Sequence, residues 1–132
     1  MSDTTEFKTW QDRINKLRKA QAINKLRREL AAEANHLVLD CRQADPYTYV
    51  RVGVRFGKGS LEQYYEAEAF SKRISTDAPN PERGQEIAVR RALKQIAREI
   101  YTNVGSIIWS PDSGYAPLKS EFIHRMTPEL AA

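Results

Sequence analysis

"YTYVRVGVRFGKGSLEQYYEAEAF", residues 47–70, holds two runs of alternating apolar and polar side chains on either side of GKGS. Alternation with a period of two is typical of a β-strand that buries one of its faces. The residues that share this face are Val50, Val52, Val54 and Phe56 in the first run, and Tyr65, Ala67 and Ala69 in the second. With GKGS as a tight turn, the stretch predicts an antiparallel hairpin with one core face.

The other face of the hairpin places basic side chains opposite acidic ones. Arg51 and Arg55 lie on the first strand, and Glu62, Glu66 and Glu68 follow on the second. Opposite charges on neighbouring strands form cross-strand pairs, and exposed pairs of this kind are common and contribute little to stability. We therefore expect a solvated, self-neutralised surface here rather than a functional site.

A shorter strand is predicted just before the hairpin, in HLVLDCR, residues 36–42, which the turn-prone QADP follows. Its alternation places Leu37, Leu39 and Cys41 on the core face. A buried thiol is usually an inert apolar side chain. We therefore expect Cys41 to be structural, although a nucleophilic pair of Cys41 with a histidine stays open at this point.

Residues 80–104 carry the signals of a helix start followed by one apolar stripe. Asn80 suits the N-cap, Pro81 the first helical position and Glu82 the first turn. The stripe consists of Val89, Leu93, Ile96, Ile100 and Val104. A helix with this stripe closes over the core face of the sheet.

The N-terminal region is predicted to be one long helix, or two helices in line, because no Gly or Pro occurs from Asp3 to about Ala34. Its apolar side chains change sides along the helix: Trp10, Ile14 and Leu17 share one face, and Ile23, Leu26 and Leu30 share a face roughly opposite. Two arrangements fit. Either the helix bends near residues 20–22 so that both stripes reach one core, or it is unbroken and its first half is an arm that docks on a partner or a second copy. The second stripe is the better candidate for the chain's own core.

The fold class predicted from these elements is α+β: a long N-terminal helix, a three-stranded antiparallel sheet and a C-terminal helix packed on one face. Residues 1–34 form the helix and residues 35–104 the core domain. Residues 105–132 form an irregular tail that tucks in Ile107, Ile108 and Trp109.

Composition excludes several classes of protein. The chain has 132 residues, enough for one domain with its own core, and a formal net charge of +4 with a pI near 9.3. The single Cys41 cannot form an internal disulfide, and no stretch is apolar enough to span a membrane, so we expect a cytoplasmic protein. The two histidines, His36 and His124, are too far apart in sequence to match the ligand spacing of a zinc site. GKGS is too short for a phosphate-binding P-loop. We therefore expect no catalytic residue, no metal and no cofactor.

The layout of charge is more informative than its total. Residues 13–28 contain seven cations and no acid, and the second helix carries a row of cations on the side away from its apolar stripe. Such rows can follow phosphates without reading bases, although ordinary solubilising faces are the alternative. The candidate binding residues are Arg13, Lys16, Arg18, Lys19, Lys25, Arg27, Arg28, Arg83, Arg90, Arg91, Lys94 and Arg98.

The order helix, three strands, helix resembles the double-stranded-RNA-binding-domain-like architecture over residues 36–103. The stretch GQEIAVRRAL, residues 84–93, looks like a helix of small phage and actinobacterial proteins of that type. RRALKQIAREI, residues 90–100, also resembles the helix that follows the sheet in single-strand annealing proteins. The resemblance implies a nucleic-acid-binding fold, although NPERG, residues 80–84, replaces the lysine cluster at the helix start of the RNA-binding domains.

Two functional classes follow from these observations. The first is a non-enzymatic nucleic-acid-binding module that contacts phosphates through the two basic helices. The second is a small interaction protein, such as a phage-encoded inhibitor of a host defence complex of the anti-CRISPR or anti-restriction type. In that case the partner is a nucleic-acid-binding protein complex. Trp10, Ile14 and Leu17 would then be docking residues, and the same face could join two copies into a homodimer.

Overall fold

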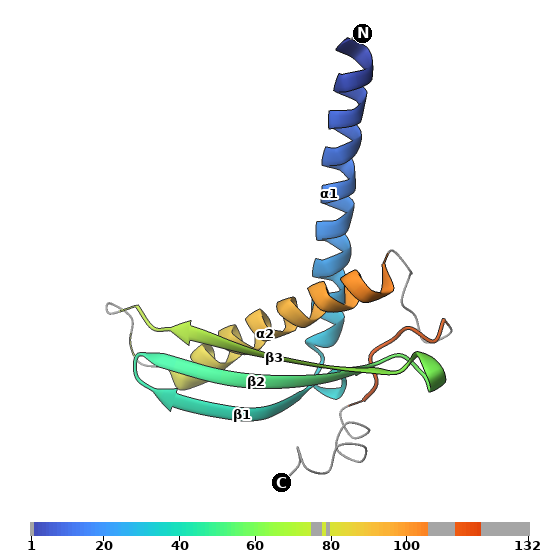
Figure 1. Cartoon of the computed structure of the whole chain (residues 1–132). Helices are drawn as coiled ribbons and strands as arrows, with labels where there is room; N and C mark the ends of the chain where they lie inside the picture. The colour runs from blue at the N-terminus through green and yellow to red at the C-terminus, as the bar shows by residue number, and fades with distance from the viewer. Residues whose placement is uncertain (1, 75–77, 79, 106–112, 120–132) are drawn as a thin grey trace.

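The computed structural model describes residues 2–74, 78, 80–105 and 113–119. Helix α1 spans Ser2–Leu30, and three strands follow: β1 (Leu37–Ala44), β2 (Tyr47–Phe56) and β3 (Gln63–Lys72). Helix α2 spans Pro81–Val104, and short 3-10 turns lie at Glu33–Asn35 and Gly59–Leu61. Both helices lie on one face of the sheet, and α1 rises steeply away from it (Figure 1). The predicted α+β class and its element order are confirmed.

The sheet is antiparallel in the order β1-β2-β3, so β2 is the central strand. All seven side chains predicted for the core face of the β2–β3 hairpin are buried. The connection between the two strands is longer than the predicted tight turn. It runs over residues 57–62, where Gly57 and Gly59 take φ values of 92° and 57° that favour glycine. The predicted hairpin is therefore correct, but GKGS is only part of a wider loop.

Strand β1 contains a β-bulge, and the prediction that Leu37, Leu39 and Cys41 share the core face is wrong. The register shifts between Val38 and Asp40, so Val38, not Leu37, lies opposite the buried Val52. A bulge places an extra residue in one strand and interrupts the alternation. Beyond it, Cys41 lies opposite Val50 on the predicted face, yet its side chain is exposed. Strand β1 is at the sheet edge, and α2 packs mainly on β2 and β3.

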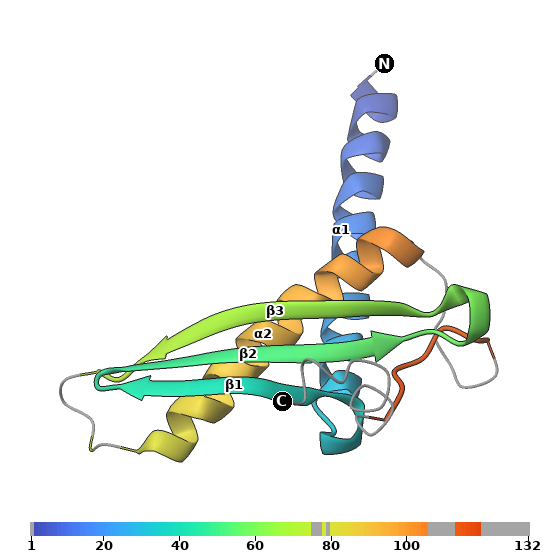
Figure 2. The same ribbon diagram turned by 60° about the horizontal axis from the view of Figure 1, so that its bottom comes forward.

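Helix α2 covers the central and third strands (Figure 2). Its N-terminus is capped as predicted, because the Asn80 side chain accepts a hydrogen bond from the backbone N–H of Arg83 at 3.2 Å. Leu93, Ile96 and Ile100 are fully buried, and Val89 and Val104 pack at the edge of the core. Sequence reasoning did not include Ala88, Ala92 and Ala97, which are also buried. Small side chains at these positions let the helix approach the sheet closely.

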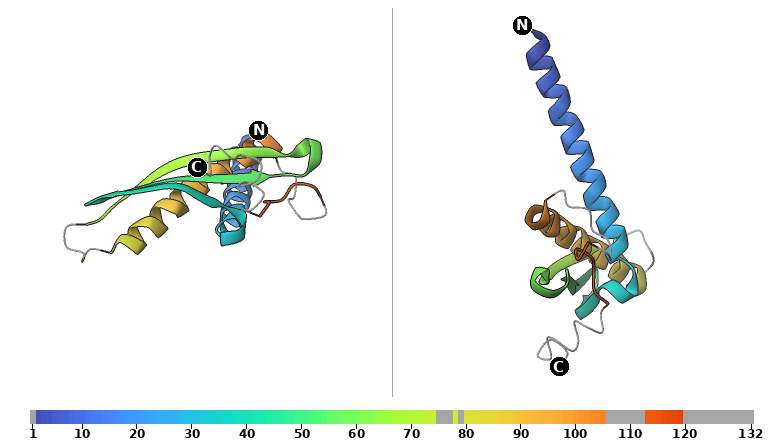
Figure 3. Two further views of the ribbon diagram at one scale, coloured as in Figure 1. Left: turned by 90° about the horizontal axis from the view of Figure 1, so that it is seen from below. Right: turned by 90° about the vertical axis from the view of Figure 1, so that its right-hand side faces the viewer.

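Helix α1 is one unbroken helix, which excludes a bend at residues 20–22, one of the two arrangements that fit the sequence. Leu26, Leu30 and Ile23 are buried in the core with α2. The N-terminal half projects from the rest of the chain (Figure 3), and the side chains of Trp10 and Leu17 are exposed there. The interpretation as a straight helix with a projecting arm therefore describes this chain.

The end of α1 is closed by two side chains that sequence reasoning did not identify. Asn35 donates from its side-chain amide to the carbonyl oxygen of Glu29 at 2.9 Å. His36 donates from Nδ1 to the carbonyl oxygen of Leu30 at 2.7 Å. Such contacts satisfy carbonyl groups that have no partner inside the helix. His36 therefore has a structural role, and His124 lies outside the described residues.

The segment at residues 113–119 extends one side of the sheet. Strand β1 pairs with β2 only as far as Gly53. Beyond that point Pro117 bridges Phe56, and the N–H of Leu118 donates to the carbonyl oxygen of Arg55 at 2.8 Å. Ala116 is buried. The predicted tail residues Ile107, Ile108 and Trp109 lie outside the described part of the chain.

Gly84 marks the closest approach of α2 to the sheet. A Cβ atom at this position would lie 2.7 Å from Oγ1 of the buried Thr48. Ser71, also buried, donates from Oγ to the carbonyl oxygen of Gly84 at 2.6 Å. The first turn of α2 is therefore held against β2 and β3 at a distance that only glycine allows.

We predict that Gly84→Ala lowers the free energy of unfolding. Overpacking of this kind costs about 1–3 kcal/mol, more than the roughly 1 kcal/mol that alanine gains over glycine inside a helix. Thr48→Ala removes the clashing oxygen, so the double variant should lose less stability than the two single variants together. Urea unfolding of the four proteins measures this coupling. Strictly additive losses would show that the two residues are not in contact.

Candidate functional site

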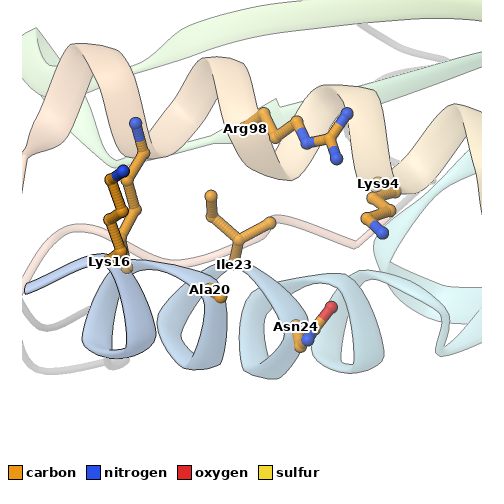
Figure 4. Close-up of a pocket in the computed structure, with 7 residues that line it drawn as sticks. Lys16, Ala20, Ile23, Asn24, Lys94 and Arg98 are labelled. Atoms are coloured by element: carbon orange, nitrogen blue, oxygen red, sulfur yellow. The ribbon is translucent and has the colours of Figure 1, made fainter. Parts of the chain in front are cut away.

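An open groove of about 210 Å³ lies where α1 crosses α2 (Figure 4). Four of its seven lining side chains are cations and none is a carboxylate. The lining residues are Lys16, Lys19, Ala20, Ile23 and Asn24 from α1, and Lys94 and Arg98 from α2. The groove therefore gathers positive charge from two helices that are far apart in sequence.

The geometry of the two helices explains why these side chains meet. Residues three and four apart lie on one face of a helix, so Lys16 and Lys19 lie above Ile23 on the same side of α1. Lys94 and Arg98 are likewise four residues apart on α2. Ile23 is buried against α2 and anchors the crossing. The apolar contact thus holds the cations around the groove.

No carboxylate of the described residues lies within ion-pair distance of the four groove cations. The ammonium group of Lys19 is 5.8 Å from the centre of the Tyr101 ring, a cation–π contact that leaves its charge intact. Unneutralised cations on adjoining walls raise the local positive potential. The groove therefore has the electrostatics of an anion-binding site.

The remaining predicted cations of α2 do not line the groove. Arg91 donates from Nη1 to the carbonyl oxygen of Phe70 on β3 at 2.7 Å, so it joins the helix to the sheet. Arg90 pairs with Glu86 at 3.7 Å. Arg83 is exposed in the first turn. The predicted row on α2 is therefore divided, and only Lys94 and Arg98 line the groove.

The other predicted cations of α1 do not line the groove either. Lys25 lies nine residues after Lys16, which on a helix is half a turn away, and Arg18 points to the same far side. Arg13, Arg27 and Arg28 also lie on α1 outside the lining set. Of the twelve predicted cations, the structure thus brings together four.

The outer face of the sheet has the predicted cross-strand pairs. Arg51 and Glu66 approach to 3.2 Å, and Arg55 and Glu62 to 2.6 Å. The hydrogen bond from Arg55 lowers the pKa of Glu62. Burial, and to a smaller extent the negative charge of Glu66, raises the pKa of Tyr64 to about 12. The expected charge neutralisation is confirmed for these pairs, but the expectation that they are solvated is wrong, because the side chains of Arg55 and Glu62 are only 13% and 20% exposed.

Sequence reasoning missed several residues of the groove and arm. Asn24 and Ala20 line the groove, and Phe7 packs its ring against Trp10 with centroids 6.2 Å apart. Phe7 could have been found, since it lies one helical turn before Trp10 on the same face. The groove as a whole could not have been found, because it depends on the angle at which the helices cross.

Within the described ranges there is no group of three His, Cys, Asp or Glu side chains that could hold a metal ion. No helix among the described residues is long and apolar enough to cross a membrane. Comparison of the chain with known protein families, with curated proteins and with solved structures gives no match.

Proposed function

We propose that this protein is a non-enzymatic nucleic-acid-binding module that holds a phosphate backbone in the groove between α1 and α2. The observation that carries the proposal is the meeting of Lys16 and Lys19 with Lys94 and Arg98 around one groove that has no acidic lining residue. Cations in this arrangement bind phosphates by charge and release counterions as they do so.

The groove is suited to phosphates rather than to base edges. Reading a base requires donors and acceptors in a defined pattern, and Asn24 is the only neutral polar side chain of the seven that line the groove. Lysine acts as a mobile point charge rather than a planar, bidentate donor. Binding is therefore proposed to depend little on sequence.

A protein partner is the alternative occupant of the same groove. An acidic surface of a nucleic-acid-binding complex presents negative charge much as a phosphate backbone does, and an inhibitor of a host defence complex would use the cations in this way. The exposed Trp10 and Leu17 on the arm favour this second candidate, because they offer a protein partner an apolar contact on α1 in addition to the charged one. In either case we place the protein in the cytoplasm, supported by its single, unpaired and exposed cysteine.

The proposed groove predicts the salt dependence of binding. Replacing both Lys94 and Arg98 with Ala should weaken binding to random-sequence oligonucleotides. It should also reduce the slope of log K against log salt by up to about 1.8 for duplex and about 1.4 for single strands, because two phosphate contacts are lost. Fluorescence anisotropy over a NaCl series measures both quantities.

A matched control removes the same charge elsewhere. Lys25→Ala with Arg90→Ala also deletes two cations, one on the far side of α1 and one paired with Glu86, and should leave the slope nearly unchanged. Equal effects of the two double variants would mean that net charge, not the groove, drives binding. If the intact protein fails to bind oligonucleotides at low salt but binds a protein complex, the second candidate replaces the first.

A further prediction distinguishes Arg91 from the groove cations. Arg91→Ala should lower the free energy of unfolding by about 1 kcal/mol, because it removes a hydrogen bond between α2 and the edge strand β3. Its salt slope should equal that of the unchanged protein. Lys94→Ala should show the reverse pattern, with an unchanged urea midpoint and a smaller slope. A reduced slope for Arg91→Ala would place this residue in the binding site.

A further inference from the structure

The projecting half of α1 carries an apolar seam that no described residue outside α1 covers. The seam consists of Phe7, Trp10, Ile14 and Leu17, spaced by three, four and three residues. Phe7, Trp10 and Leu17 are 64%, 57% and 62% exposed, and Ile14 is half-buried. Side chains at this spacing form one stripe along a helix, and the same repeat forms the seam of a coiled coil.

The seam faces away from α2. Ile14 in the seam and Ile23 in the core are nine residues apart, which corresponds to half a turn around the helix axis. Because Ile23 packs toward α2, the seam lies on the opposite side of α1. A helix that packs on the seam would therefore leave the cationic groove open.

We propose that the occupant of the seam is a second copy of this chain, whose α1 packs antiparallel to the first. The proposal does not depend on what binds in the groove. In this arrangement Phe7 of one copy meets Leu17 of the other, and Trp10 meets Ile14, so that the four apolar side chains of each copy form four layers. The two-fold axis passes near residue 12.

The distribution of charge along α1 supports pairing with a second copy of α1 in the antiparallel direction. Glu6, Lys8 and Asp12 give residues 6–12 a net charge of −1, whereas residues 13–28 carry seven cations and no acid. A parallel pair would place the two basic segments side by side, and like charges at that distance repel. An antiparallel pair places residues 6–12 of each copy beside residues 12–18 of the other, with Glu6 level with Arg18.

The dimer would place its two grooves at opposite ends. The groove residues of α1 are centred near Ala20, eight residues from the axis. The two grooves are therefore about 24 Å apart along the helices. A seam of two heptads buries a small area for a protein interface, so we expect a dissociation constant on the order of micromolar.

Sedimentation equilibrium from about 1 to 500 μM tests the association. The intact chain should pass from monomer to dimer over this range, and Leu17→Glu should stay monomeric. Trp10→Glu, on the neighbouring layer, should do the same. Asn15→Glu makes the same charge change on an exposed position of α1 outside the seam and should still dimerise. Circular dichroism melting should be similar for the monomeric variants, since the seam lies outside the core.

An intact chain that remains monomeric throughout this range would overturn the proposal. So would loss of the dimer in Asn15→Glu together with its retention in Leu17→Glu. Because this measurement needs no nucleic acid, its failure is distinct from a failure of the proposed function.

Spin-label distances test the direction of the pair. Cys41 is replaced by Ser, and a nitroxide is placed on Gln11→Cys or on Lys25→Cys, two positions that flank the seam in the same way. In an antiparallel dimer the separation along the axis is about 3 Å for residue 11 and about 39 Å for residue 25. A parallel dimer gives nearly equal distances at the two positions, and this result would overturn the antiparallel arrangement.

Discussion

A straight helix cannot turn two opposite faces toward one core, and the architecture of this chain depends on that constraint. Helix α1 continues without a break from Ser2 to Leu30 while its apolar side chains change sides. The Ile23, Leu26 and Leu30 stripe enters the core because it lies next to the sheet in sequence and packs on α2. The first stripe is consequently held away from the core. A projecting arm and a crossing of two helices are both consequences of the same constraint.

The crossing also explains how cations come to be gathered without neutralising partners. Burial of Ile23 fixes where α1 meets α2. Lys19 and Lys16, about one and two turns before Ile23 on the same side of α1, must then lie next to Lys94 and Arg98. Placing like charges together raises the free energy of the folded state by an amount that depends on salt. The apolar contact beneath them offsets this. The groove thus holds four cations together around a buried apolar contact.

Much of the fold could be predicted from local patterns. The alternation at Val50, Val52 and Val54 and the cap at Asn80 follow from rules that involve neighbours in sequence, and both are confirmed. The prediction for β1 was wrong for two reasons. The bulge arises from how β1 pairs with β2, and the exposure of β1 arises from where α2 packs on the sheet. The alternation of residues within β1 indicates neither. For the same reason the exposure of Cys41 was not predicted.

The candidate site could be predicted only in part. The sequence indicates which residues are cationic, but whether a cation is free depends on what lies beside it. Arg91 shows the difference, since it has the same spacing and charge as its neighbours Lys94 and Arg98 and yet bonds to the backbone of β3. Of the twelve candidate cations, the way in which α1 crosses α2 brings four together around the groove and leaves eight outside it.

The segment around Pro117 bears on the order in which the sheet is assembled. Hairpin pairings of β1 with β2 and of β2 with β3 join residues close in sequence, so their loop-closure cost is small. The bridge from Phe56 to Pro117 spans sixty-one residues and closes a much longer loop. Contacts of this kind generally form late, after the local pairs. The end of β2 at Phe56 should therefore remain an open edge in the nascent chain until the segment around Pro117 has been synthesised.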